Sequence, residues 1–76
     1  ENIMYIKRLK DLREDNDYTQ EYIGTKTHMK REQYSRYETG KRDIPLDTLI
    51  ELSKLYNTSV DYILNLTDEK KPYPRK

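Results

Sequence analysis

The chain contains no cysteine, tryptophan or phenylalanine, and only one histidine among its 76 residues. The absence of cysteine excludes disulfides and thiolate metal sites, and with only one histidine no zinc site is predicted. No apolar run approaches the roughly 18 residues of a membrane span, and no signal-peptide pattern is present. We therefore expect a soluble cytoplasmic protein with no metal, no cofactor and no membrane association.

The sequence also lacks the residue combinations on which enzymes depend. It has no nucleophile–base set, no cluster of metal ligands and no glycine-rich phosphate loop, so no enzymatic role is predicted. No strand pattern, internal repeat or low-complexity segment is present. Nothing in the sequence indicates a small-molecule ligand.

What the chain does contain is charge and tyrosine. Charged residues make up 38% and apolar residues 33%, close to the range where disorder begins, but eight tyrosines and regularly spaced leucine and isoleucine favour folding. A chain this short buries only about 60% of its unfolded surface. We expect one small folded domain of modest stability.

The net charge of +1 conceals an uneven distribution. Residues 26–42 carry six cations and two anions, whereas residues 43–69 carry one cation and six anions. Residues 70–76 add four cations and no anion. A basic band in the middle of the chain is typical of a protein that presents one face to a polyanion.

Apolar spacing predicts three helices in the first half of the chain. The first reaches about Asn16, the second covers about 20–27 after a Thr19 cap, and the third covers about 31–39. Gly24 is costly within a helix unless another helix crosses closely there, and Gly40 can supply a left-handed helix end. The side chains expected to face inward in the second and third helices are Tyr22, Ile23, Tyr34 and Tyr37.

Two further helices are predicted in the second half. One has Pro45 in its first turn, and the other runs from Val60 to about Leu66 after a Ser59 cap. We expect a domain over residues 1–66 and a flexible basic tail over 67–76. The mostly buried residues of the fourth helix should be Leu46, Leu49, Ile50, Leu52 and Leu55.

A family resemblance rests on five blocks of sequence. Their order and spacing together are far more specific than any one block alone. The blocks are Ile6–Arg13, Thr19–Glu21, Ser35–Lys41, Leu46–Ile50 and Ser59–Leu64. In these blocks the chain resembles the lambda-repressor-like (Cro-type, XRE family) helix-turn-helix domains. The resemblance implies an all-α, compact five-helix fold in which the second and third helices form the helix-turn-helix and the third is the recognition helix.

The resemblance also implies site residues, and elementary chemistry agrees with their types. An α-helix fits the DNA major groove, where arginine can bond guanine, glutamate can accept from cytosine, and serine can bond either kind of base. It further implies a structural ion pair between Arg13 and Glu38. The implied base-reading residues are Arg31, Glu32, Ser35 and Arg36, and the implied DNA backbone contacts are Gln20, Lys30, Gln33, Thr39, Lys41 and Arg42.

The turn before the third helix departs from the family pattern. His28 stands where the family usually has glycine, and Lys30 stands where it has a serine or threonine cap. Histidine tolerates a positive φ better than most residues, so the turn can form, and Gln33 could offset part of the missing cap. These departures leave the start of the third helix open by one residue.

The favoured functional hypothesis is a sequence-specific transcriptional regulator of double-stranded DNA. We expect a repressor that binds a two-fold operator as a homodimer, with a dimer surface at the fifth helix that includes Tyr62, Leu64 and Leu66. The alternative is an antitoxin or anti-repressor type of protein-interaction module on the same fold. Its working surface would be acidic and would consist of Asp43, Asp47, Glu51 and Asp61.

Interpretations without a DNA-binding role also exist for the two basic segments. Arg31, Glu32 and Arg36 could form a solvated helix face, with Glu32 and Arg36 paired at i,i+4 spacing. The tail 70–76 could serve only as a solubilising end, or it could make a secondary contact with DNA phosphate.

Overall fold

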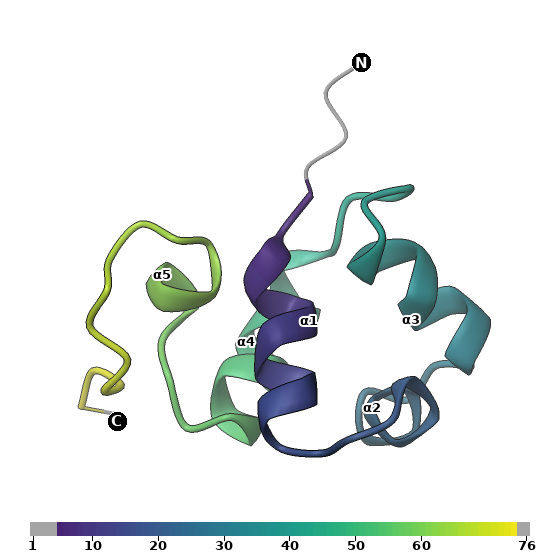
Figure 1. Ribbon diagram of the computed structural model, residues 1–76, viewed down its shortest axis with the longest axis horizontal. Helices are drawn as coiled ribbons and strands as arrows, with labels where there is room; N and C mark the ends of the chain where they lie inside the picture. Colours follow the sequence, from purple (N-terminus) through teal and green to yellow (C-terminus); the bar gives the residue numbers. More distant parts are fainter. Residues whose placement is uncertain (1–4, 75–76) are drawn as a thin grey trace.

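The computed structural model describes residues 5–74 and contains five helices. These are α1 (Lys7–Asp15), α2 (Gln20–Lys26), α3 (Arg31–Glu38), α4 (Leu46–Leu55) and α5 (Val60–Ile63). Figure 1 shows α1 across the middle of the molecule, with α2 and α3 to one side and α5 to the other. No β-strand occurs within residues 5–74, and the predicted all-α, five-helix fold is confirmed.

All five helices contribute to one hydrophobic core. Leu9, Ile23 and Leu52 are completely buried, and so is the large ring of Tyr34. Complete burial of an aliphatic or aromatic side chain stabilises the fold by about 1.5–3 kcal/mol relative to exposure. The remaining core residues are Ile6, Leu12, Leu49, Tyr56 and Ile63.

Three turns of four residues each join consecutive helices by the same geometry. They cover residues 16–19, 27–30 and 56–59, and the second residue of each has a left-handed backbone, with φ of 58°, 62° and 53°. In each turn the third residue donates its N–H to the carbonyl five residues earlier, at 2.8–3.0 Å. This is the Schellman ending of a helix. The second residues are Asp17, His28 and Asn57, so none of these left-handed positions is a glycine.

Three side chains expected in the core lie instead at the surface. Leu46 is 65% exposed, Ile50 40% and Tyr22 38%, so the prediction for these residues was wrong. The buried stripe of α4 consists of Thr48, Leu49, Leu52 and Ser53, which leaves positions 46 and 50 on its outer side. Tyr22 packs at the surface against the ring of Tyr18, with centroids 4.6 Å apart.

Helix α5 is shorter than predicted. It ends at Ile63, because Asn65 has a φ of 64° and the N–H of Leu66 bonds the carbonyl of Asp61 at 2.9 Å. The prediction that this helix continues to Leu66 was wrong, since asparagine in the left-handed conformation ends a helix as glycine does. Leu66 lies beyond the helix and is 72% exposed.

Arg8 connects α1 to the end of α5 and the segment that follows. Its Nη1 donates to the carbonyls of Tyr62 and Thr67 at 2.8 Å, and its Nη2 donates to Asp68 at 2.9 Å. The guanidinium also lies 4.0 Å from the centre of the Tyr62 ring, within cation–π range. One side chain therefore joins segments that are 54–60 residues apart.

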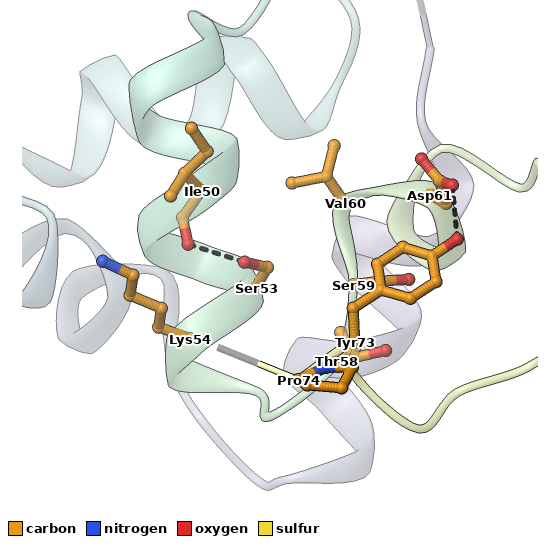
Figure 2. Close-up of a pocket in the computed structure, with 9 residues that line it drawn as sticks. All are labelled: Ile50, Ser53, Lys54, Thr58, Ser59, Val60, Asp61, Tyr73 and Pro74. Carbon is orange, nitrogen blue, oxygen red and sulfur yellow. Dashed lines mark hydrogen bonds between the residues drawn. The ribbon is translucent and has the colours of Figure 1, made fainter. Parts of the chain in front are cut away.

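Residues 67–74 have no regular secondary structure and contact α5 and the turn before it. The hydroxyl of the buried Thr58 donates to the carbonyl of Lys70, and the Tyr73 hydroxyl donates to Asp61 at 2.8 Å. Figure 2 shows Tyr73 and Pro74 beside a hollow of about 610 Å³ between this segment, α4 and α5. The flexibility of the tail stays a prediction, and its last two residues lie outside the described residues.

Candidate nucleic-acid interface

Helices α2 and α3 approach closely at Gly24. A Cβ atom at this position would lie 2.7 Å from the Met29 carbonyl oxygen, nearer than real Cβ contacts allow. The N–H of Met29 bonds the Gly24 carbonyl at 2.8 Å. A close approach at Gly24 was expected from a crossing helix, but the nearest neighbour is the backbone of the turn that leads into α3. The glycine thus fixes how α3 is placed against α2.

The start of α3 agrees with the boundary predicted from the sequence. Arg31 is its first residue, and Lys30 is an N-cap whose side chain makes no capping hydrogen bond. His28 has the left-handed φ of 62° that the family pattern assigns to glycine. In contrast, Thr19 and Ser59 accept hydrogen bonds from the backbone N–H of Tyr22 and Tyr62 at 3.0 and 2.9 Å, as predicted for caps.

The two faces of α3 differ in composition. Tyr34 and Glu38 point inward and are 0% and 4% exposed. Of the four predicted base-reading residues, Arg31, Glu32 and Arg36 are exposed and Ser35 is half-buried. Arg31 approaches Glu32 to 3.5 Å, and the alternative Glu32–Arg36 ion pair does not occur among the ion pairs of residues 5–74. The helix therefore presents two arginines and a glutamate to solvent.

The predicted ion pair between Arg13 and Glu38 is present. Nε and Nη2 of Arg13 donate to the two carboxylate oxygens at 2.8 and 3.0 Å, and the Glu38 side chain is only 3% exposed. Burial alone would raise the pKa of Glu38, but the hydrogen bonds from Arg13 and Gln20 outweigh it and lower the pKa below its ordinary value. The carboxylate therefore stays charged and joins α1 to the end of α3.

Gln20 has a structural partner that sequence reasoning missed. Its Nε2 donates to Glu38 Oε1 at 3.1 Å, so the first residue of α2 also belongs to the α1–α3 ion-pair cluster. The two residues are 18 positions apart, and no local spacing in the sequence indicates the contact. Gln20 remains a predicted DNA backbone contact with one of its amide hydrogens engaged.

The other predicted backbone contacts flank α3. Lys30, Gln33, Lys41 and Arg42 are all exposed, the first two near the start of the helix and the last two beyond its end. Thr39 is exposed as well, and its hydroxyl donates to the Ser35 carbonyl at 2.9 Å. The predicted contacts thus surround the base-reading face of α3 from both ends of the helix.

Residues 5–74 contain no group of three or more histidine, cysteine, aspartate or glutamate side chains that could hold a metal ion. None of the five helices is long and apolar enough to cross a membrane. The hollow in Figure 2 has one cation and one anion among its lining side chains, Lys54 and Asp61.

Helices α2 and α3 pack against each other and are joined by the four-residue turn 27–30, which is the arrangement of a helix-turn-helix. The family model described as HTH_3, helix-turn-helix, matches residues 9–63 of this chain. The chain belongs to this XRE-type helix-turn-helix family. The family consists of DNA-binding regulators and not of enzymes, in agreement with the sequence-based prediction.

The chain is also similar to regulators of Bacillus subtilis (strain 168). It is 42% identical over 69 residues to YobD, named an uncharacterized HTH-type transcriptional regulator, covering 91% of this chain and 62% of YobD. It is 42% identical over 65 residues to the HTH-type transcriptional regulator ImmR, covering 86% of this chain and 51% of ImmR. The chain thus spans about half to three-fifths of the length of these relatives. No solved structure matches it.

Proposed function

We propose that the protein is a sequence-specific regulator of transcription that places α3 in the major groove of double-stranded DNA. The observation that carries this proposal is the outward face of α3, where Arg31, Glu32 and Arg36 are exposed on a helix fixed by Tyr34 and Glu38. Side chains on such a helix can reach base edges, while flanking cations contact phosphates. Similarity to two transcriptional regulators supports the same function.

Base reading and backbone contact predict different responses to substitution. Arg36→Ala should lower affinity for the preferred duplex by roughly 1–3 kcal/mol and relax one base position, because a bidentate contact to a base is lost. Lys41→Ala should weaken binding to every duplex alike and reduce its salt dependence. A matching loss of affinity on specific and random duplexes for Arg36→Ala would contradict its assignment to base reading.

The decisive measurement is selection of bound sites from a random duplex library, followed by a salt titration with the selected site. A two-fold sequence motif is expected, with half-sites about 34 Å apart, one turn of duplex. Binding without sequence preference would overturn the proposal of a specific regulator.

We further propose that the protein acts as a repressor and homodimer, with Leu66 at the centre of the dimer surface. Leu66 is 72% exposed beyond the end of α5 and leaves apolar surface that a partner subunit could bury. Less of this surface is exposed than the sequence suggested, because Arg8 lies over the ring of Tyr62 and Leu64 packs partly against the core. Sedimentation of the wild type and of Leu66→Lys, with and without DNA, should show a dimer that the substitution weakens.

An alternative function as a protein-interaction module rests on α4. Leu46 and Ile50 are exposed one helical turn apart, and Asp47 and Glu51 follow each of them on the adjoining face. Such a surface suits a partner that is apolar and basic. Pull-down of a stable protein partner that still binds after double substitution of Arg31 and Arg36 would favour this alternative.

A further inference from the structure

Helix α1 carries four cations, and three of them are held by carboxylates. Lys7 pairs with Asp11 at 2.9 Å, Arg8 with Asp68 at 2.9 Å, and Arg13 with Glu38 at 2.8 Å. Lys10 is the remaining cation, it is exposed, and it takes part in no ion pair among residues 5–74. Its charge is therefore available to a partner outside this chain.

Lys10 lines an open hollow of about 510 Å³ together with two predicted DNA backbone contacts. These are Gln20, the first residue of α2, and Thr39, the residue after α3. The hollow thus lies where α1, the start of α2 and the end of α3 meet. Family resemblance implied Gln20 and Thr39 as DNA backbone contacts but did not imply Lys10. The structure places Lys10 beside both of them.

The hydrogen-bond donors of this hollow suit an anion. Gln20 Nε2 gives one N–H to Glu38 at 3.1 Å, and a second N–H remains because a side-chain amide has two. The same contact holds the amide at the hollow, and the ammonium group of Lys10 supplies up to three donors. Both oxygens of Glu38 accept from Arg13, which offsets its negative charge.

We propose that Lys10 contacts a DNA phosphate, so that α1 forms part of the DNA-binding surface beside Gln20 and Thr39. The inference rests on the proposed function and adds a backbone contact that the family pattern did not provide. A phosphate contact carries no base information, so Lys10 contributes to affinity and not to sequence preference. Glu14 lines the same hollow and opposes the anion by its charge.

The test compares Lys10→Gln with Lys7→Gln on the selected duplex and on a random duplex, over a range of salt concentrations. Both substitutions remove one positive charge from α1, but Lys7 lines a different hollow, toward the end of α5. Lys10→Gln should lower affinity on both duplexes by the same factor, about 3- to 10-fold at 0.1 M salt, and reduce the salt slope by about 0.9. Lys7→Gln should change the slope much less.

Two further variants sharpen the result. Glu14→Gln should raise affinity for both duplexes, and Lys10→Arg should retain wild-type affinity and slope. Equal salt slopes for Lys10→Gln and Lys7→Gln would overturn the role of Lys10 while leaving the proposed function intact. Failure of the wild type to bind any duplex would overturn both. Thermal melts of the variants verify folding, which substitution of the exposed Lys10 should leave unchanged.

Discussion

The turn between α2 and α3 and the turn between α4 and α5 share one geometry but differ in the residues that stabilise it. Both contain four residues, 27–30 and 56–59, with a left-handed second residue. In both, the N–H of the third residue bonds a carbonyl five residues earlier at 2.8 Å. The second residue is His28 in one turn and Asn57 in the other, and the cap is Lys30 in one and Ser59 in the other.

The difference shows that the α2–α3 turn keeps its geometry with locally less favourable residues. Asparagine tolerates the left-handed conformation well, and serine caps a helix by accepting a backbone N–H. A lysine at an N-cap provides no such acceptor, and its charge is unfavourable at the positive end of the helix macrodipole. The same charge is favourable toward a phosphate. Lys30 is thus unfavourable for the isolated helix and favourable for the proposed function.

The largest expected effect comes from removing the ion pair that supports the α2–α3 side of the molecule. Glu38→Gln should lower the free energy of unfolding by about 3 kcal/mol, because it leaves the largely buried Arg13 without its charged partner. The α4–α5 turn has no buried ion pair of this kind among residues 5–74. Chemical denaturation of the variant and the wild type measures the difference, and a loss below about 1 kcal/mol would contradict this role for Glu38.

The same ion pair predicts how stability depends on pH. The pKa of Glu38 is lower in the folded protein than its ordinary value of 4.5, so its contribution is complete above pH 4.5. Stability should fall as the pH drops from 4.5 through the lowered pKa of the folded state, because the unfolded chain binds the proton more readily. Unfolding curves from pH 7 to pH 3 should show this decline in the wild type, and a smaller one in Glu38→Gln.

The next effect concerns the close approach at Gly24. Gly24→Ala should destabilise the protein by about 1–3 kcal/mol, although alanine favours helices, because its Cβ would lie 2.7 Å from the Met29 carbonyl oxygen. Thr25→Ala, at an exposed position of the same helix, is the matched control and should be nearly neutral. Thermal melts of both variants measure the difference. Greater stability in Gly24→Ala would show that the turn before α3 can move away from α2 without cost.

The capping residues predict different losses of stability in the two turns. Ser59→Ala should cost about 1 kcal/mol, because the backbone N–H of Tyr62 loses its acceptor, whereas Lys30→Ala should cost almost nothing. Lys30→Ser should stabilise α3 by about 0.5–1 kcal/mol and yet weaken DNA binding. Denaturation and duplex titration of the same samples measure both effects. Stronger DNA binding by Lys30→Ser would oppose a phosphate contact at this position.

The smallest effect distinguishes the two left-handed residues. His28→Gly should stabilise the protein by up to about 1 kcal/mol, because glycine adopts a positive φ without steric cost. Asn57→Gly should gain less, since asparagine already tolerates that conformation. A comparison of the two melting temperatures tests this order. The reverse order would indicate that His28 makes favourable contacts that outweigh its backbone strain.

The sequence predicted helices better than it predicted which side chains they bury. Helical spacing and the Thr19 and Ser59 caps located all five elements, because these signals are local. Periodicity could not decide between Leu46 and Leu49, since both lie within a broad apolar stripe and only contact with other helices selects one. The end of α5 was missed because the left-handed role of Asn65 depends on backbone geometry.

The exposed face of α3 could be predicted from the sequence, whereas contacts between helices could be predicted only where the family resemblance implied them. Family resemblance implied Arg31 and Arg36 as base-reading residues, an assignment that stays a prediction, and it also implied the ion pair of Arg13 and Glu38, which is present. The contact between Gln20 and Glu38 joins α2 to α3, and no sequence signal specified it. Lys10 likewise gained its assignment only from the position of α1 beside two other helices.

The long reach of Arg8 has a consequence for the order in which the chain folds. The hydrogen bonds of the α2–α3 turn join residues three to five positions apart, whereas those of Arg8 span 54–60 residues. Contacts between distant residues require closure of a large loop and form after local ones. We expect the helix-turn-helix to be native-like at the folding barrier and the Arg8 contacts to form beyond it. Loss of the Arg8 contacts would then chiefly raise the unfolding rate and change the folding rate little.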